Sequence, residues 1–89
     1  MKTIDELRSE IDEIDDGLVS LFLQRLAVVK EVGEAKKTLS LSVEDKDREN
    51  AVIERLTVNK TDEEKKKITE LYNKIFDISK ETEKCKNIF

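Results

Sequence analysis

One amphipathic pattern, from Thr3 to Lys37, constrains this chain more than any other feature. Apolar residues recur there in alternating steps of three and four, at Ile4, Leu7, Ile11, Ile14, Leu18, Leu21, Val28, Val32 and Ala35. This spacing is typical of a helix whose apolar seam packs nearly parallel to another helix. Arg25 interrupts the seam, where it would be buried among Leu21, Val28 and Val32, and a buried guanidinium requires an anion. The pattern predicts one long helix with a cation in its packing face.

The expected helix is too long for a compact chain of this size. About 34 residues at ~1.5 Å each give a rod of roughly 50 Å. A compact chain of 89 residues has a radius of gyration of only about 12 Å. Two shorter helices from the same chain cannot cover so long a seam. We therefore expect a homodimer whose two-fold axis crosses the long helix.

Start signals divide the rest of the chain into two further helices. Thr3 with Glu6, and Thr61 with Glu64, have the spacing of a capping box, in which a hydroxyl and a carboxylate satisfy free amides of the first turn. Asp45 has the position of an N-cap before a short helix. The expected helices cover residues of about 4–37, 46–58 and 62–86. The predicted fold class is all-α, a long, a short and a long helix in a single domain of residues 1–89.

Composition limits the chemistry and the partners. The chain has no histidine and one cysteine, Cys85, so the usual imidazole metal sites, imidazole dyads and internal disulfides are excluded. The net charge is −4, with cations interleaved among acids, which argues against nonspecific binding to nucleic acid. No apolar run has the length of a secretory signal or a membrane span. We expect a cytoplasmic protein without a metal site.

Several charged side chains share faces of the expected helices. Arg25 and Lys36 are eleven residues apart, close to three turns, so both lie on one face about 16 Å apart and can converge on a small ligand. Arg8 lies about 26 Å before Arg25, too far to reach the same ligand. In an antiparallel dimer Arg8 could reach the partner's site. On the third helix, Ser79 and Glu83 share a face at the i, i+4 spacing.

Asp45, Arg48 and Glu49 fall on one side of the second helix. Each of the residues on these faces also has an ordinary structural interpretation, as a helix cap, a helix-end lysine, a small seam residue or a solvent-exposed charge. From spacing alone that interpretation is favoured for all of them except Arg25. The seam position of Arg25 makes a surface role awkward.

Taken together, these features resemble the all-helical chorismate mutases, which are small intertwined dimers of three-helix protomers. The resemblance covers nearly the whole chain. It is most specific in four segments that occur in the right order and spacing: residues 7–15 (LRSEIDEID), Arg25 with residues 32–36 (VGEAK), residues 43–49 (VEDKDRE) and residues 75–80 (IFDISK).

The resemblance implies an enzyme that rearranges chorismate to prephenate in the biosynthesis of phenylalanine and tyrosine. This pericyclic reaction needs neither a nucleophile nor a cofactor. The protein must hold one compact conformer and stabilise the charge that develops on the breaking ether oxygen. By the family's pattern, Arg25, Arg48 and the partner's Arg8 would clamp the two carboxylates, with help from Ser79. The planar fork of arginine suits this clamp.

The same pattern assigns the other polar residues. Lys36 would donate to a carboxylate and to the ether oxygen, while Asp45 and Glu49 would bind the ring hydroxyl. Glu83 stands where many members carry glutamine as a second donor to the ether oxygen. An ionised carboxylate cannot donate, so Glu83 would have to be protonated, with burial opposing the pull of Lys36 and Arg48. As some fungal members have glutamate here and favour acid, turnover is expected to fall as pH rises.

Two other functions stay open from the sequence alone. A lyase of the same fold, which eliminates pyruvate from isochorismate, would keep the arginine clamp and the lysine. A noncatalytic helical dimerisation module is an alternative of a different class. Arg25 argues against such a module, because a buried unpaired charge costs several kcal/mol and a scaffold gains nothing from it.

Overall fold

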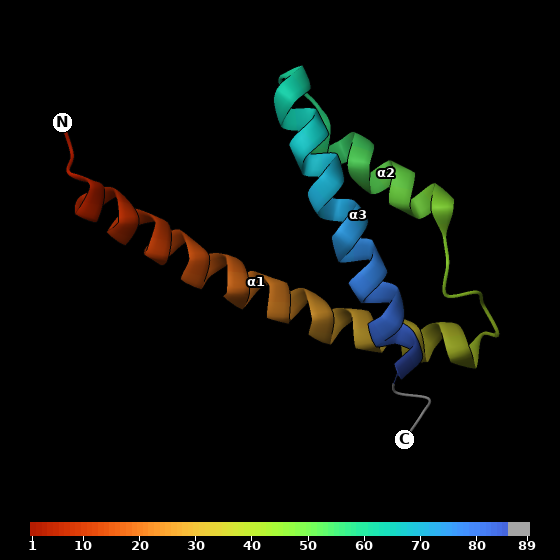
Figure 1. Cartoon of the computed structure of the whole chain (residues 1–89). Coiled ribbons are helices and arrows are strands. Elements are labelled where there is room, and N and C mark those ends of the chain that lie inside the picture. Colours follow the sequence, from red (N-terminus) through yellow and green to blue (C-terminus); the bar gives the residue numbers. More distant parts are fainter. Residues whose placement is uncertain (86–89) are drawn as a thin grey trace.

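Three helices make up the part of the chain that the structure, a computed structural model, describes (Figure 1). This part is residues 1–85, without the side chain of Cys85. Helix α1 spans Ile4–Thr38, α2 spans Lys46–Thr57 and α3 spans Asp62–Cys85, with no strand in residues 1–85. The predicted all-α class with a long, a short and a long helix is confirmed. Lys86, the expected last residue of the third helix, lies outside the described residues.

The helices begin where their capping residues indicate. Thr3 Oγ1 accepts from the Glu6 amide at 3.1 Å, and Glu6 Oε1 accepts from the Thr3 amide at 3.1 Å. The same reciprocal pair forms between Thr61 and Glu64, at 3.1 and 3.0 Å. Asp45 Oδ1 accepts from the amide three residues later at 2.9 Å. Local chemistry at these residues therefore sets the start of every helix.

Helix α3 packs against both other helices, whereas α1 and α2 have no Cα atoms within 8 Å of each other in the described residues. Figure 1 shows α2 and α3 as a hairpin, with the C-terminal part of α3 crossing the C-terminal part of α1. The N-terminal half of α1 extends away from this crossing. The radius of gyration, 16.5 Å, therefore exceeds the value of about 12 Å for a compact chain of this length.

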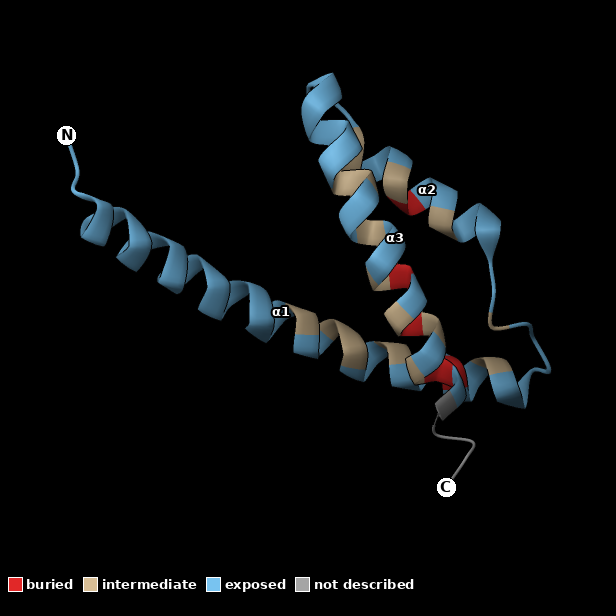
Figure 2. Ribbon diagram, in the orientation of Figure 1, coloured by how far each residue is buried: buried red, intermediate tan, exposed pale blue. Residues whose placement is uncertain are grey.

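The apolar core of the protomer is small and lies on α3. In the described residues the buried apolar side chains are Val52 of α2 and Phe76 of α3, and Gly33 is the buried residue of α1 (Figure 2). The Phe76 ring meets the Tyr72 ring edge-on, with centroids 5.8 Å apart. Ser79 and Glu83 of α3 are also buried, so polar side chains occupy much of the little interior that exists.

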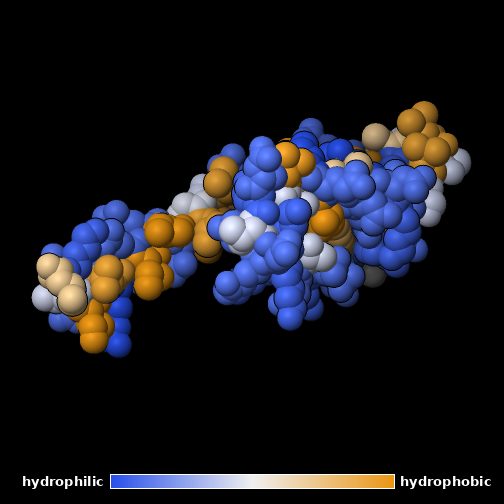
Figure 3. All heavy atoms as spheres, turned by 90° about the horizontal axis from the view of Figure 1, so that it is seen from above, coloured by the Kyte–Doolittle hydropathy of each residue, from blue (hydrophilic) through white to orange (hydrophobic). Residues whose placement is uncertain are grey.

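Most of the apolar seam of α1 is uncovered in the protomer. Its six N-terminal members are between 46% and 66% exposed: Ile4, Leu7, Ile11, Ile14, Leu18 and Leu21. Figure 3 shows the hydrophobic side chains along this extended arm in orange. A stripe of this length is unusual on the surface of a monomer and marks an interaction surface.

The expected burial of Arg25 among Leu21, Val28 and Val32 requires a second copy of the seam, so it stays a prediction. These three side chains are 64%, 56% and 42% exposed in the protomer, while Arg25 is half-buried. The half-buried apolar residues of α1 are Phe22, Leu26 and Val29, next to the seam. Helix α3 approaches on that side, so Arg25 lies at the boundary between the covered face and the uncovered seam.

None of the helices in residues 1–85 combines the length and the apolar character needed to cross a membrane.

The cap of α3 gives a first prediction. Thr61→Ala removes the hydroxyl that accepts from the Glu64 amide and should lower the free energy of unfolding by about 1 kcal/mol. Thr61→Ser keeps the acceptor oxygen and should retain most of the stability. Denaturant unfolding followed by far-UV circular dichroism measures both. Equal midpoints for the alanine variant and the wild type would show that this cap adds nothing.

Candidate active site

A cavity of about 280 Å³ lies where the C-terminal part of α1, the start of α2 and the C-terminal part of α3 meet. Its size is close to the lower end of small-molecule pockets, ~300–1,000 Å³. Seven of the eight residues predicted for the site line this cavity: Arg25, Lys36, Asp45, Arg48, Glu49, Ser79 and Glu83. Valine side chains and Phe76 form the apolar part of its wall. The helices thus bring together residues that are up to 58 positions apart, from Arg25 to Glu83.

Arg8 is the predicted residue that the protomer does not bring to the cavity. It is exposed on the N-terminal arm of α1 and is absent from the cavity lining. Its distance from Arg25 along the straight helix, about 26 Å, prevents the two side chains from reaching one small ligand. A contribution from Arg8 therefore requires a second copy of the chain.

Arg25 is oriented by contacts with α3. Its Nη1 donates to Ser79 Oγ at 2.6 Å, and Ser79 Oγ donates to the Ile75 carbonyl at 2.7 Å. The Arg25 guanidinium carbon lies 5.9 Å from the centroid of the Tyr72 ring, within the range of a cation–π interaction. Ser79 and Tyr72 are neutral, so these contacts fix the guanidinium without compensating its charge. The charge is available to an anionic ligand.

An ion pair between Lys36 and Glu83 lies deeper in the site. Lys36 Nζ is 3.1 Å from Glu83 Oε1, and the two side chains are 19% and 7% exposed. Lys36 Nζ also donates to the Val43 carbonyl at 2.9 Å. Glu83 Oε1 is buried and has no aligned hydrogen-bond donor in the described residues, so its contact with Lys36 is an ionic approach without hydrogen-bond geometry.

Glu83 Oε1 has the Lys36 charge beside it but no aligned hydrogen-bond donor. A ligand that donates a hydrogen bond can satisfy it, and protonation of the carboxyl group makes Glu83 itself a donor. The surface role that spacing alone favours for Glu83 is wrong, since only 6% of this residue is exposed.

Gly33 sets the distance between α1 and α3 beside this ion pair. A Cβ atom on Gly33 would lie 3.0 Å from the Glu83 Cα, 3.1 Å from its Cβ and 3.2 Å from its Cγ. These distances are at the limit of what real Cβ atoms allow, so glycine permits the approach that buries Glu83. Helical spacing alone gives Gly33 no such role. The signal present was the position of Gly33 in the segment 32–36, three residues before Lys36.

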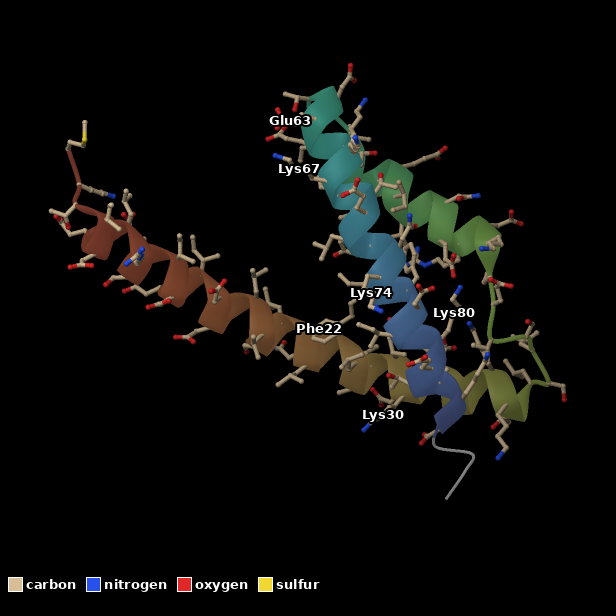
Figure 4. All side chains as sticks on the ribbon, viewed as in Figure 1. Phe22, Lys30, Glu63, Lys67, Lys74 and Lys80 are labelled. Carbon is tan, nitrogen blue, oxygen red and sulfur yellow. The ribbon has the colours of Figure 1, made fainter. Side chains whose placement is uncertain are left out.

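The start of α2 supplies the remaining polar residues. Asp45 and Arg48 flank the first turn, where the Asp45 carboxylate caps the Arg48 amide at 2.9 Å. Glu49 is 18% exposed, and its Oε2 lies 3.2 Å from Lys80 Nζ. Lys80 also lies 3.2 Å from Glu44 Oε1, and Figure 4 shows its side chain on the side of α3 that faces α2. Sequence reasoning gave Lys80 no role, although it ends the segment 75–80.

The ion pairs of Lys80 shift two protonation equilibria. Hydrogen bonds to Glu44, and then to Glu49, raise the pKa of Lys80 above its ordinary value. The hydrogen bond from Lys80, followed by that from Lys46, lowers the pKa of Glu44. Both groups are therefore charged at neutral pH.

In the described residues, no group of three or more acidic or cysteine side chains is placed to hold a metal ion. The chemistry of the cavity comes from cations, carboxylates and one hydroxyl. A profile of the family described as chorismate mutase type II matches residues 7–84. The chain belongs to this family. The match includes all eight residues predicted for the site and all three helices in large part.

Three curated relatives are consistent with membership of this family. The chain is 35% identical over 51 residues to a chorismate mutase of Methanocaldococcus jannaschii. The aligned residues make up 57% of this chain and 52% of that protein. It is 39% identical over 54 residues to a T-protein of Haemophilus influenzae, covering 61% of this chain and 14% of the relative. A bifunctional chorismate mutase/prephenate dehydratase of Aquifex aeolicus is 36% identical over 56 residues, covering 63% and 16%. The aligned stretches thus span about half or less of these relatives.

A solved structure supports the fold over nearly the full length. The conserved hypothetical protein from Pyrococcus furiosus superposes with a TM-score of 0.77 at 34% sequence identity. The superposition covers 93% of this chain and 97% of the archaeal chain. The family fold expected from the sequence is therefore confirmed.

Gly33 gives a second prediction, with Gly17 as its matched control. Gly33→Ala should lower the unfolding midpoint, because overpacking costs ~1–3 kcal/mol and exceeds the gain in helix propensity. A Cβ on Gly17 meets nothing within 4 Å, so Gly17→Ala should stabilise the helix by up to ~1 kcal/mol. Thermal unfolding of both variants measures the difference. A Gly33→Ala variant as stable as Gly17→Ala would contradict the close approach of α1 and α3.

Proposed function

We propose that this protein catalyses the rearrangement of chorismate to prephenate in the biosynthesis of aromatic amino acids. The observation that carries the proposal is the convergence on one cavity of Arg25 and Lys36 from α1, Arg48 from α2 and Glu83 from α3. Chorismate carries two carboxylates, a ring hydroxyl and an enolpyruvyl ether. The cavity offers cations for the two carboxylates, acidic side chains for the ring hydroxyl and a donor for the ether oxygen.

The cations bind and fold the substrate. Arg25 and Arg48 each present a planar fork of N–H donors that matches a carboxylate. Ser79 and Tyr72 already hold the Arg25 guanidinium in place, so little side-chain entropy is lost when the substrate binds. The carboxylates of Asp45 and Glu49, at the start of α2, offer acceptors for the single proton of the ring hydroxyl. These contacts keep the enolpyruvyl group over the ring, where its terminal carbon can react.

The reaction itself takes place within the substrate. The ether C–O bond breaks while a new C–C bond forms, and no atom is transferred to the protein. Negative charge grows on the ether oxygen in the transition state, and the Lys36 ammonium donates to it. Because Lys36 is only 19% exposed, water screens this interaction less than it would at the surface. Catalysis then consists of conformer selection and electrostatic stabilisation.

Glu83 acts as the second donor to the ether oxygen when it is protonated. In the cavity Lys36 Nζ lies 3.1 Å from Glu83 Oε1, and that oxygen is buried without an aligned hydrogen-bond donor. The ionised form keeps the pair with Lys36 but cannot donate.

The role of Glu83 leads to a prediction about pH. Turnover of chorismate should fall with rising pH, because an ionised Glu83 carboxylate cannot donate to the ether oxygen. Glu83→Gln donates at every pH and should flatten the profile. The measurement is the loss of chorismate absorbance with the purified protein, with the product identified at each pH.

The outcomes of this experiment separate the candidate functions. Prephenate formed at equal rates throughout the pH range retains the mutase and removes the donor role of Glu83. Pyruvate released from isochorismate, with chorismate left unchanged, would replace the mutase by the lyase. No turnover of either compound would contradict an enzymatic function and favour a dimerisation module.

The proposed active protein is a homodimer with shared sites. The uncovered seam of α1 is continuous with the part of the helix that α3 covers, so a second copy of α1 in antiparallel orientation would cover it. The same arrangement would place the partner's Arg8 near the cavity. Each site would then hold three arginines, two from one protomer and one from the other.

Subunit mixing tests the shared site. Arg8→Ala and Arg25→Ala should each lower kcat/KM by at least ~30-fold, the effect of removing one buried charged contact. When the two variants are unfolded and refolded together, half of the dimers are mixed, and one of their two sites has both arginines. The mixture should recover roughly a quarter of wild-type activity.

Arg25→Ala mixed with Arg48→Ala is the matched control. Both residues line the cavity of the same protomer, so no mixed dimer contains an intact site and no recovery is expected. Recovery in the control, or its absence in the Arg8 mixture, would contradict the shared site. Analytical ultracentrifugation gives the oligomeric state of each variant.

A further inference from the structure

Lys80 occupies part of the cavity that none of the proposed substrate contacts uses. It lines both the cavity and an outer groove formed by α3 and residues 42–44. Its Nζ lies 3.2 Å from Glu49 Oε2 on the inner side and 3.2 Å from Glu44 Oε1 on the outer side. Figure 4 shows its side chain leaving α3 toward α2. Lys80 therefore bridges α3 to the start of α2.

The two ion pairs of Lys80 differ in their exposure to solvent. The Glu49 side chain is 18% exposed, as against 53% for Glu44. Water and salt screen the outer pair strongly and the inner pair much less, so the pair with Glu49 is the stronger restraint. Glu44 also lies 3.4 Å from Lys46 Nζ. Glu44 is thus shared between Lys46 and Lys80, whereas Glu49 forms the less exposed ion pair with Lys80.

Glu49 needs such a restraint. It projects from a short helix that has no close backbone approach to α1, so its position relative to Arg25 and Lys36 is set through α3. A glutamate side chain without a partner loses rotamer freedom when a ligand fixes it, and this loss weakens binding. Lys80 engages Oε2, and a carboxylate accepts through both oxygens. Glu49 thereby remains able to accept from a ligand hydroxyl while its side chain is held.

We propose that Lys80 is a positioning residue, which holds the Glu49 carboxylate in the cavity so that Glu49 can bind the ring hydroxyl of the substrate. The inference rests on the proposed function, since it concerns the same site and the same ligand. The contacts with Glu44 and Glu49 raise the pKa of Lys80, so the lysine stays protonated at every pH at which the site operates. Lys80 acts through Glu49 and does not touch the substrate.

A double-mutant cycle on Lys80 and Glu49 tests this inference. Lys80→Met keeps the length of the side chain and removes its charge, and it should raise KM for chorismate by roughly 3- to 30-fold with a smaller change in kcat. In a Glu49→Gln background the same change should have little effect, because the group that it positions is already altered. Lys80→Arg keeps the cation and should restore most of the affinity.

Two controls separate positioning from a merely structural link. Lys74→Met removes another lysine of α3, exposed and outside the cavity, and should leave KM unchanged. Thermal unfolding of each variant shows whether it is folded at the assay temperature. If Lys80→Met fails to fold, Lys80→Gln replaces it in the same cycle, since glutamine lacks the charge but keeps a donor.

The results distinguish the inference from the proposed function. A rise in KM that is present with Glu49 and absent with Gln at position 49 supports the positioning role. An equal rise in both backgrounds, or no rise in a folded variant, overturns it while the mutase function stands. A wild-type protein that does not convert chorismate overturns the proposed function and this inference with it.

Discussion

The structure depends on a mismatch between the apolar seam of α1 and the surface that its own chain can place on it. Helix α3 packs on the C-terminal part of α1 beside the seam, and the seam from Ile4 to Leu21 has no cover in the protomer. At the C-terminal end of α1, the packed helices enclose a cavity. The N-terminal end carries enough exposed apolar surface to bind another helix. One amphipathic pattern therefore specifies both the site and the surface through which a second copy would complete it.

Within the covered end, the buried carboxylate of Glu83 is central to the proposed chemistry. Glu83 is held against α1 because Gly33 has no side chain, and the Lys36 ammonium beside it offsets only part of the cost of burial. A protein selected for stability alone would place an apolar residue there. The arrangement suits a ligand that carries a negative charge and a hydrogen-bond acceptor. For that reason the proposed rearrangement would need no nucleophile, metal or histidine.

Much of this arrangement could be predicted from the sequence, because it follows from local rules. The capping pairs at Thr3 and Thr61 mark helix starts within a few residues, and eleven positions between Arg25 and Lys36 are close to three turns, so a shared face is dictated by helical geometry. The packing of one helix on another is not local. Which side of α1 receives α3 depends on the crossing angle and on the fit of ridges into grooves.

The roles that sequence reasoning missed all arise from that packing. Helix α3 packs on the side of α1 that carries Phe22, Leu26 and Val29, which the seam pattern did not indicate. Gly33 and Lys80 belong to segments that carried the family resemblance, but their contacts with Glu83 and Glu49 cross between helices. No periodicity along the chain encodes those distances.

The arrangement of the helices also has a consequence for how such a site can change. Helices α1 and α2 each pack on α3 and not on each other. The distance between the cations of α1 and the acids of α2 therefore depends on two separate contacts, α1 with α3 and α2 with α3. A substitution between α2 and α3, such as one beside Val52, can rotate the short helix and alter that distance while the contact between Arg25 and Ser79 is unchanged. New ligand preferences in this architecture can therefore originate in the hydrophobic contact behind the cavity, at residues that touch no ligand.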